Sequence, residues 1–595
     1  MKEEWFEDPP TNLVDLFEDS VKKFPNRPWL GELNDEGKYE WITYKEASKR
    51  VDNLRSGLAQ IGIKKDDAVG LIINNSIDWA IIAFATYGLG ARLIPMYQKE
   101  LEKVWRYIVE DGGIKVLFVV DNEVYEKTKH YKDEIQSLEN IYLIQGEGEN
   151  TMSGLEKLGS ENPVPSIKPH WSDIAGLIYT SGTTGDPKGV LLSHGNFATN
   201  VKAAHLGYPD VSEKDRSYSI LPWAHSFGQT AELNHGTYAG ASIALMKSLD
   251  NLTTEIAIAQ PTLLIAVPRI FNKVYAGIHN KLEEEGKAHL LELAKDTAAK
   301  IRNGEKPGFK GKLISSIVFK KIKKLFGGKL RYAITGSAVM NPEIGQFFID
   351  VGIPTFDCYG LTETSPALTM NTPASNKLGS VGRAIKDVTV VIDKSRVGED
   401  SEDGEIICFG PNVMQGYHNK PQKSAEVFVE DEKLGRGLRT GDRGRLDEDG
   451  FLYITGRFKE EYKLENGKYV HPASIEEELK LAPHIANAMV FGDGKPYNVG
   501  IIFPDFEALQ KYAKEQNISF NDHKALIKEA NVQRFLADQA TQQLKGNFGG
   551  YEIPKKWIFI DEDFSLENGM LTQTMKLKRR NVLKTYGDQL NSLYK

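Results

Sequence analysis

The chain has 595 residues, of which 41% are hydrophobic and 26% are charged. This balance is typical of globular proteins and excludes disordered, collagen-like and coiled-coil compositions. At about 150 residues per domain, the length corresponds to about four domain-sized units. The 82 acidic and 74 basic residues leave a formal net charge of −8, so we expect no nucleic-acid partner bound through bulk charge.

The cysteine content and the first residues favour a reducing compartment. Cys358 and Cys408 are too few for a disulfide framework or a four-thiolate zinc site. Residues 1–10 are acidic and lack the cationic and apolar blocks of a secretory signal. The longest apolar run, 79–91, is shorter than the ~20 residues needed to cross a bilayer and predicts a buried helix. We expect a cytoplasmic protein.

The first third of the chain alternates helical and strand-like patterns. Residues 12–24 carry apolar side chains at helical spacing, after a Pro-Pro-Thr stop signal. Residues 68–73, 115–120 and 174–179 are short apolar runs typical of buried strands. This alternation predicts a parallel α/β sheet.

A strand-helix-strand unit is predicted between residues 330 and 358. Asn341 and Pro342 are typical of the N-cap and first position of a helix, and Gly352 is a helix stop. The predicted parts are a strand at 330–335, a tight turn at 336–338, a helix to Val351 and a strand at 353–358.

The composition changes twice after this unit. Short strands separated by Gly and Asp predict a β-rich subdomain over 378–456. Beyond residue 458 lysine and helix-forming residues increase, so we place a domain boundary near 456–459.

One segment is strongly basic. No acidic residue lies between Glu305 and Glu343, whereas Arg331 and eight lysines do: 306, 310, 312, 320, 321, 323, 324 and 329. Apolar residues at approximate helical spacing accompany them. Two interpretations stay open: a solvated basic helix face, or a patch over 306–331 that contacts an anionic membrane or substrate.

The segment 179–189, Tyr-Thr-Ser-Gly-Thr-Thr-Gly-Asp-Pro-Lys-Gly, is the strongest chemical signal. Its three glycines allow the backbone to curl after a strand, so that successive N–H groups converge on an anion. Hydroxyl donors and the ammonium of Lys188 suit phosphate. The spacing is not that of a Walker A motif.

This loop resembles the signature of the adenylate-forming acyl-CoA synthetase superfamily, which includes fatty-acid–CoA ligases and firefly luciferase. Further segments resemble the family's motifs in the same order: 335–338, 357–364, 440–442 with 454–457, and 459–463 with 467–470 and 472–476. The similarity spans residues 12–585.

The resemblance implies an α/β, multi-domain α+β fold. A large N-terminal adenylation domain, 1–456, would contain two αβαβα-type sheets and a β-rich subdomain. A small mobile α+β domain, 457–595, would follow a hinge near Lys459. The long-chain branch has a helical insertion, here about 276–326.

The resemblance also implies site residues. Lys188, Thr362, Glu363 and Lys576 match catalytic positions, and Glu363 matches the Mg²⁺ ligand. The positions that match contacts to ATP or AMP are Thr180, Ser181, Gly182, Thr183, Thr184, Gly185, Lys188, Gly336, Ser337, Ala338, Asp357, Tyr359, Gly360, Thr362, Asp442, Ile454, Arg457 and Lys576.

The chemistry of these residue types agrees with that role. In-line displacement at the α-phosphate of ATP needs neutralisation of phosphate charge more than an acid or a base. Glu363 offers the oxygen ligand that Mg²⁺ prefers. Asp442 suits a ribose diol, Arg457 donates to ribose or phosphate oxygens, and Tyr359 offers a ring on which adenine can stack.

Two lysines compete for the terminal catalytic position. Lys576 aligns best with the lysine that reaches the α-phosphate in relatives, and Lys578 is a close rival because Gln573 and Met575 replace the Pro and Gly of many relatives. Lys463 and Gly467 match the face that lines the coenzyme A pantetheine tunnel in the second step.

The segment 221–227 resembles the acyl-pocket segment, with Trp223 and His225 on the acyl side. Residues 268–275 and the insertion resemble the long-chain branch, so we expect ATP-dependent ligation of a long-chain fatty acid to coenzyme A. Transfer to a carrier-protein thiol, or a medium-chain or aryl acid as substrate, stays open. Luciferase-type oxidation has no dedicated signal, and a non-catalytic lipid-binding protein is disfavoured by the retained catalytic positions. The sequence predicts no oligomeric state.

Overall fold

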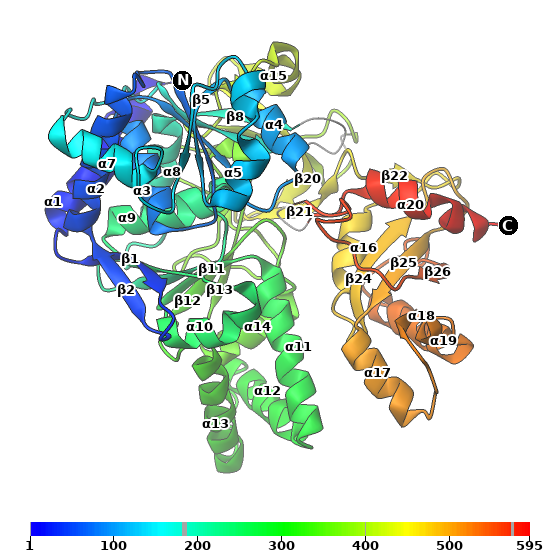
Figure 1. Cartoon of the computed structure of the whole chain (residues 1–595). Helices are drawn as coiled ribbons and strands as arrows, with labels where there is room; N and C mark the ends of the chain where they lie inside the picture. The colour runs from blue at the N-terminus through cyan, green and yellow to red at the C-terminus, as the bar shows by residue number, and fades with distance from the viewer. Residues whose placement is uncertain (1, 181–186, 399, 573–575) are drawn as a thin grey trace.

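The computed structural model describes residues 2–180, 187–398, 400–572 and 576–595. In these residues the strands form two large sheets, a five-stranded sheet, a three-stranded sheet and a two-stranded hairpin. Figure 1 shows the two large sheets in the main body, and the segment beyond residue 457 as a separate lobe at the right. The α/β, multi-sheet fold class predicted from the sequence is confirmed.

One large sheet has the order β18-β8-β7-β4-β3-β5-β6. Its strands are β3 (Ala68–Ile72), β4 (Arg92–Met96), β5 (Ile114–Val119), β6 (Asn140–Leu143), β7 (Ile174–Thr180), β8 (Lys188–Ser193) and β18 (Gly416–Tyr417). The strands from β6 to β7 are parallel, and β8 and β18 pair antiparallel at one edge. Every residue of β3 is buried, as expected for a parallel sheet covered on both faces.

The other large sheet has nine strands in the order β15-β14-β13-β12-β11-β9-β10-β1-β2. They are β1 (Pro28–Leu33), β2 (Tyr39–Thr43), β9 (Arg216–Ser219), β10 (Ser242–Leu245), β11 (Leu263–Ala266), β12 (Tyr332–Thr335), β13 (Thr355–Gly360), β14 (Ala367–Met370) and β15 (Arg383–Ala384). The six strands from β1 to β13 along this order are parallel. The carboxyl ends of β12 and β13 therefore lie at one edge.

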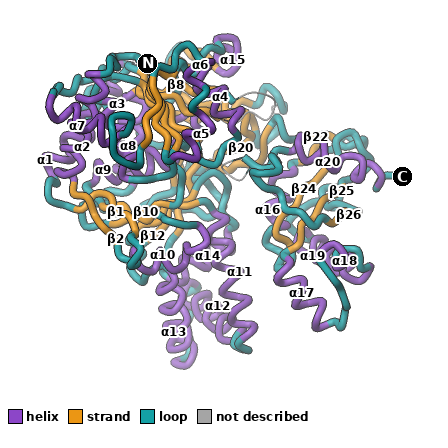
Figure 2. The backbone as a smooth tube through the Cα atoms, in the orientation of Figure 1, coloured by secondary structure: helices purple, strands orange, loops and turns teal. Residues whose placement is uncertain are grey.

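The helices of the first 240 residues cover and separate the sheets (Figure 2). They are η1 (Glu3–Phe6), α1 (Leu13–Lys23), α2 (Tyr44–Gln60), α3 (Ile77–Tyr87), α4 (Glu102–Asp111), α5 (Asn122–Thr128), α6 (Tyr131–Glu134), α7 (Met152–Glu161), α8 (His194–Gly207), η2 (Gly228–Asn234) and α9 (His235–Ala239). α3 is the predicted buried helix, with all residues from 79 to 87 buried. α8 is buried along nearly its whole length because it lies between the two sheets (Figure 1).

Helices of the predicted insertion pack on the opposite face of the nine-stranded sheet. The helices of this region are η3 (Leu249–Asn251), α10 (Leu252–Ala259), α11 (Pro268–Glu284), α12 (Ala288–Arg302), α13 (Phe309–Leu325) and α14 (Pro342–Val351). Their inner faces form a second hydrophobic cluster around Phe271, Phe326 and Phe348. Figure 1 shows α12 and α13 extending beyond the main body.

The rest of the chain forms the five-stranded sheet and the lobe. The sheet consists of β16 (Thr389–Asp393), β17 (Gly404–Phe409), β19 (Phe428–Asp431), β20 (Gly435–Leu446) and β21 (Leu452–Arg457), with η4 (Thr362–Thr364) and α15 (Pro421–Val427) nearby in sequence. The lobe contains β22 (Tyr462–Lys463), β23 (Tyr469–Val470), α16 (Pro472–Leu479), β24 (Ile485–Phe491), β25 (Val499–Pro504), α17 (Phe506–Glu515), α18 (His523–Leu526), α19 (Ala530–Leu544), β26 (Lys556–Phe559) and α20 (Arg579–Ser592). Three hydrophobic clusters form its own core.

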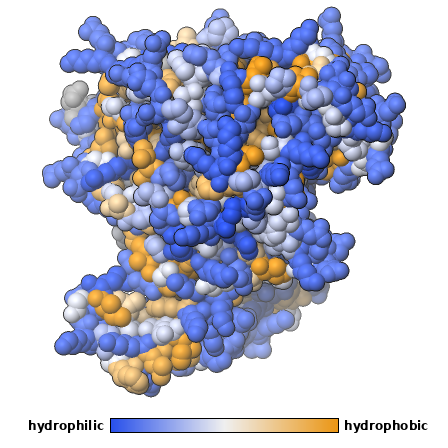
Figure 3. Space-filling view, turned by 90° about the vertical axis from the view of Figure 1, so that its left-hand side faces the viewer, coloured by the Kyte–Doolittle hydropathy of each residue, from blue (hydrophilic) through white to orange (hydrophobic). Residues whose placement is uncertain are grey.

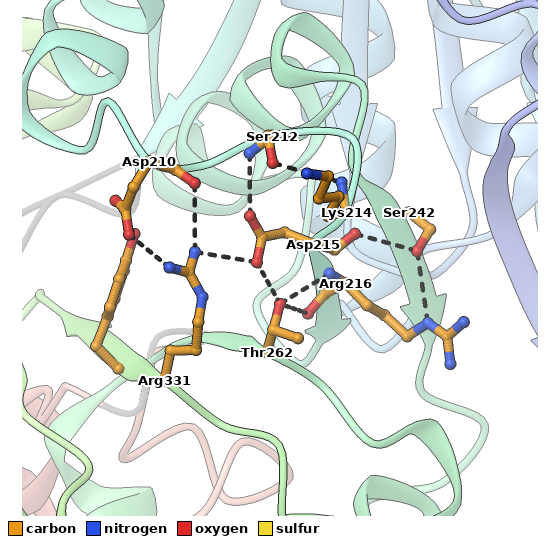
Figure 4. Close-up of polar contacts among 9 residues, drawn as sticks. Asp210, Ser212, Lys214, Asp215, Arg216, Ser242, Thr262 and Arg331 are labelled. Carbon is orange, nitrogen blue, oxygen red and sulfur yellow. Dashed lines mark hydrogen bonds and ion pairs between the residues drawn. The ribbon is translucent and has the colours of Figure 1, made fainter.

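A polar network joins the amino ends of three strands of the nine-stranded sheet (Figure 4). The Asp215 carboxylate accepts hydrogen bonds from the Ser212 backbone N–H at 3.0 Å, Thr262 Oγ1 at 2.7 Å and Arg331 Nη2 at 3.0 Å. These residues lie just before β9, β11 and β12. The network fixes the strands at one end, while the opposite ends carry the turns described below.

Local signals located several elements correctly. α14 runs from Pro342 to Val351, with Asn341 as its N-cap and Gly352 in the left-handed region at φ 84°. α1 begins after its N-cap Asn12, as predicted for 12–24. α11, which runs into the predicted insertion, begins at Pro268, and this proline occupies its first turn. Within the described residues, no helix is long and apolar enough to cross a membrane.

Candidate active site

Two turns follow the carboxyl ends of β12 and β13. Asp357 Oδ1 accepts a hydrogen bond from Thr335 Oγ1, and Oδ2 accepts one from the Met340 N–H at 3.3 Å, so this carboxylate secures the turn at 336–338. Burial raises the pKa of Asp357 to about 6. We therefore assign Asp357, predicted as a nucleotide contact, a place beneath the turn.

Both turns require glycine. A Cβ on Gly336 would lie 3.0 Å from the Phe227 ring, and one on Gly360 would lie 1.8 Å from the Pro366 carbonyl oxygen. Ser337 adopts φ 70°, which leaves the turn tightly curled. The predicted positions Gly336, Ser337 and Gly360 thus shape the edge through the backbone.

Lys188 and Glu363 both contact Tyr417. The Lys188 ammonium lies 4.2 Å from the centroid of the Tyr417 ring, and the Tyr417 hydroxyl donates to Glu363 Oε1 at 2.8 Å. Burial and the nearby ammonium of Lys459 lower the pKa of Lys188, and Glu363 opposes that shift. Lys459, the predicted hinge residue, is exposed and lies near Lys188.

Thr362 lies next to Glu363 in η4. Its side chain is buried, and Ser226 Oγ donates to its Oγ1 at 3.3 Å. Thr180 and Lys188 face each other across the β7–β8 pair. The predicted contacts Ser181, Gly182, Thr183, Thr184 and Gly185 lie outside the described residues.

Asp442 joins Tyr359 to Arg457. The Tyr359 hydroxyl donates to Asp442 Oδ2 at 2.6 Å, and Arg457 Nε donates to Asp442 Oδ1 at 2.6 Å. Asp442 raises the pKa of Arg457. Each carboxylate oxygen has a second lone pair, so this arrangement keeps acceptors for a ribose diol. Ile454 is half-buried on β21, opposite Gly444.

The C-terminal lobe brings Lys576 to this group. Leu571 and Leu577 form an antiparallel bridge, and the Lys576 N–H donates to Thr572 Oγ1 at 3.0 Å. The Lys576 side chain keeps exposed surface, but protein around its ammonium displaces water and, with Arg457, lowers its pKa. The carboxylates of Asp442, Glu460 and Glu363 act in the opposite direction.

Lys578 lies at the N-cap of α20, and its backbone N–H donates to Met570 O at 2.7 Å. The structure brings Lys576 into electrostatic contact with Glu363 and Arg457.

Trp223 and His225 differ in their surroundings. Trp223 is fully buried, packs edge-on to Trp79 and donates from Nε1 to Glu232 Oε2 at 3.0 Å. It thus supports the wall of the site without forming its surface. His225 is half-buried, and the loss of water together with Lys576 lowers its pKa to about 4, so the ring is neutral at pH 7.

A small cavity lies behind Phe227. It is lined mostly by apolar groups from α8, η2 and the strand ends, among them Ala204, Phe227, Ile334 and Met370. Because Phe227 also touches the Gly336 turn, this cavity adjoins the site.

Lys463 and Gly467 lie on the β22–β23 hairpin, beside α20 in Figure 1. The Lys463 ammonium lies 5.3 Å from the Tyr469 ring centroid. Among the described residues, neither makes a hydrogen bond or an ion pair with Lys188, Glu363, Asp442 or Lys576. The structure thus does not bring this predicted pair to the other site residues.

Sequence reasoning missed Tyr417, Ser226 and Glu460. A lone tyrosine or serine carries no local signal of function. Tyr417 and Glu363 are 54 residues apart in the sequence, and Tyr417 is fixed through the pairing of β18 with β8.

The fold and the site define an α/β protein with lysines, an arginine and carboxylates gathered at the carboxyl ends of its strands, where ligands of such sheets bind. The chain belongs to the AMP-binding enzyme family: residues 17–418 match the family's model, and residues 461–540 match the model of the AMP-binding enzyme C-terminal domain.

The chain is similar to curated proteins along nearly its whole length. It is 29% identical to the long-chain-fatty-acid–CoA ligase FadD15 of Mycobacterium bovis, over 94% of this chain and 93% of that protein. It is 28% identical to long chain acyl-CoA synthetase 8 of Arabidopsis thaliana, over 97% and 88%. The adenylation domain of a carboxylate reductase from Mycobacterium chelonae has the same fold, with a TM-score of 0.78, 21% identity and coverage of 100% and 92%.

Proposed function

We propose that this protein activates a long-chain fatty acid with ATP and transfers the acyl group to coenzyme A. The fatty acid and ATP would give an acyl-adenylate and pyrophosphate, and coenzyme A would then give acyl-CoA and AMP. The convergence of Lys188, Glu363, Arg457 and Lys576 from four distant segments carries this proposal. The names of the relatives support the substrate and the acceptor.

In the first step the fatty-acid carboxylate attacks the α-phosphorus and pyrophosphate leaves with the electron pair of the broken P–O bond. Lys576 and Lys188 supply positive charge where the phosphate charge spreads. Burial lowers the pKa of both lysines because each ammonium lacks full hydration, and this strengthens its attraction to an incoming phosphate. Arg457 and Asp442 would bind the ribose.

Glu363 is suited to Mg²⁺. Its Oε1 accepts from Tyr417, and a carboxylate has further oxygen lone pairs for a hard cation. In the part of the chain that the structure describes, no three His, Cys, Asp or Glu side chains gather as a metal site. That fits a cation held by one carboxylate together with substrate phosphates. Mg²⁺ would supply neutralisation of phosphate charge when bound.

We propose the same division of the chain as the sequence predicts, with a mobile C-terminal domain over 457–595. β21 ends at Arg457, two residues before Lys459. In the second step the sulfur of coenzyme A attacks the acyl carbonyl, AMP leaves, and the thiol proton is released. Rotation about Lys459 would replace Lys576 with Lys463 and Gly467 near the acyl-adenylate.

The acyl side favours an apolar substrate. The cavity behind Phe227 is lined mostly by carbon atoms, and no charged side chain lines it. A long-chain fatty acid as substrate agrees with the names of the relatives. The alternatives are transfer to a carrier-protein thiol and use of medium-chain or aryl acids. Assays with different acyl acceptors and with acids of different chain length would distinguish them.

We also propose a cytoplasmic location with peripheral membrane contact through 306–331. Phe309, Leu313 and Ile317 recur every four residues on α13 and are 83%, 51% and 48% exposed. Five lysines of the same helix are also exposed: 310, 312, 320, 321 and 324. In Figure 3 hydrophobic surface gathers at the lower end of the molecule. An anionic bilayer would accept both kinds of side chain.

Pyrophosphate exchange into ATP tests the first step, with acids of increasing chain length, aryl acids and no acid as the control. Thioester detection then compares coenzyme A with an acyl carrier protein. We expect exchange that is greatest with long-chain acids, and a thioester of coenzyme A. Absence of exchange with every acid would refute the proposed function.

A further inference from the structure

Tyr417 is held firmly although it belongs to a strand of two residues. β18 pairs antiparallel with β8, which places Tyr417 opposite Val190, two residues after Lys188. The Tyr417 N–H donates to Ser424 Oγ at 2.8 Å, and its ring is 6% exposed. The Met414 N–H donates to the Glu363 carbonyl oxygen at 2.9 Å, so the same segment also holds the backbone of Glu363.

The side chain of Tyr417 has two different contacts. Its ring face receives the Lys188 ammonium at 4.2 Å, a cation–π geometry. Its hydroxyl donates to Glu363 Oε1 at 2.8 Å, a hydrogen bond to a charged acceptor. Burial and the Glu363 carboxylate raise the pKa of Tyr417, so the hydroxyl keeps its proton at neutral pH.

Opposite charges that lie close together normally form an ion pair, especially where water is scarce. Among the described residues, neither Lys188 nor Glu363 has an ion-pair partner within 4.0 Å. Tyr417 contacts both of them, through its ring face and its hydroxyl.

We propose that Tyr417 is a positioning residue that keeps Lys188 and Glu363 apart and aims them at the triphosphate and its cation. The ring of Tyr417 attracts the Lys188 ammonium through a cation–π contact but carries no charge that would neutralise it. The hydroxyl holds one carboxylate oxygen, so that the other is left for a divalent cation. This inference builds on the proposed function, since it assigns Lys188 and Glu363 to the bound nucleotide and its cation.

Two substitutions separate the two contacts. Tyr417→Phe removes the hydroxyl and keeps the ring, whereas Tyr417→Leu removes both. Tyr131→Phe is the matched control, because Tyr131 is also buried and donates one hydroxyl hydrogen bond, to Glu102 O at 3.0 Å, away from the site. Thermal unfolding verifies that each variant is folded.

Binding of a non-reactive α,β-methylene ATP analogue is measured calorimetrically with and without Mg²⁺, and Mn²⁺ binding in its presence by electron paramagnetic resonance. We expect Tyr417→Phe to weaken Mn²⁺ binding roughly ten- to hundredfold, as for loss of one hydrogen bond to a charged group, and to leave metal-free nucleotide binding unchanged. Tyr417→Leu should weaken metal-free binding as well, through Lys188.

A double-mutant cycle completes the test. In a Glu363→Gln background, Tyr417→Phe should cause no further loss of Mn²⁺ binding, because the hydroxyl acts through that carboxylate. Wild-type Mn²⁺ binding in Tyr417→Phe, or additive losses in the double variant, would overturn the inference. Failure of the proposed function is a separate result: wild-type protein without pyrophosphate exchange.

Discussion

Lys576 and Glu232 are two ionisable side chains whose surroundings, more than their residue types, decide their behaviour. Lys576 is a surface lysine by exposure, yet protein atoms and Arg457 lower its pKa. Glu232 is 1% exposed on η2 and accepts hydrogen bonds from Ser219 Oγ and from Trp223 Nε1. Each leads to a test at the level of a single residue.

Lys576→Ala should reduce pyrophosphate exchange at least ~100-fold, because an oxyanion-stabilising group is lost. The variant should still convert supplied acyl-adenylate to thioester at nearly the wild-type rate. Lys578→Ala is the matched control, two residues away, and should retain both half-reactions. Equal loss of both steps in Lys576→Ala, or loss of exchange in Lys578→Ala, would assign the catalytic position differently.

Glu232→Gln should stabilise the protein more at pH 8 than at pH 5.5. Burial raises the pKa of Glu232 from 4.5 to about 7, so the folded protein favours the protonated carboxyl. Its stabilising contribution is complete below pH 4.5 and is lost as the pH rises through 7. Differences in Tm between variant and wild type at the two pH values measure this effect, and a difference that does not change with pH would contradict it.

Among the elements, α13 stands out because it carries large apolar side chains that are exposed to solvent. Its inner residues, Val318 and Ile322, pack in the cluster around Phe348, whereas Phe309, Leu313 and Ile317 face solvent. The sequence showed a basic stripe and left two interpretations open, a solvated face and a membrane patch. The exposure of Phe309, Leu313 and Ile317 favours the interpretation that this face contacts a membrane.

Co-sedimentation with liposomes tests this helix. Wild-type protein should bind vesicles rich in anionic lipid and bind zwitterionic vesicles weakly, because lysines near an anionic surface contribute ~1 kcal/mol each. Replacing Phe309, Leu313 and Ile317 by Ser should reduce binding at least roughly tenfold, and so should Gln at lysines 320, 321, 323 and 324. Gln at exposed lysines 514, 524, 528 and 545 is the control of equal charge; equal binding by all variants would refute the contact.

At the scale of the whole molecule, polar contacts join the lobe to the body; among the residues that the structure describes they include the half-buried pair Arg443–Glu461 at 3.5 Å. Asn341 Nδ2 donates to Glu478 Oε2 at 3.5 Å, and Lys511 lies 3.4 Å from Glu284. Exposed pairs of this kind contribute little to stability. The lobe has its own hydrophobic core, so the proposed rotation would not require it to unfold.

Gly467→Val should therefore separate the two half-reactions. Gly467 turns the β22–β23 hairpin at φ 83°, a conformation that a β-branched residue adopts only with strain. Pyrophosphate exchange should stay within about twofold of wild type, and thioester formation should fall at least ~10-fold. Gly546→Val, at φ 96° with open space around it, is the control for strain in the lobe. A matching loss of exchange in Gly467→Val would contradict rotation of the lobe.

Features that depend only on residues close together in the sequence, such as helix ends and motifs, could be predicted from the sequence. Asn341, Pro342 and Gly352 bound α14 because caps and stops act within one helical turn. The order of motifs gave the family, which the family models confirm. Tertiary structure is needed to establish that Lys576 approaches Arg457, that Trp223 is buried, and that Tyr417 contacts both Lys188 and Glu363. Those relations join segments up to hundreds of residues apart, and only the packing of sheets and lobe sets the distances between them.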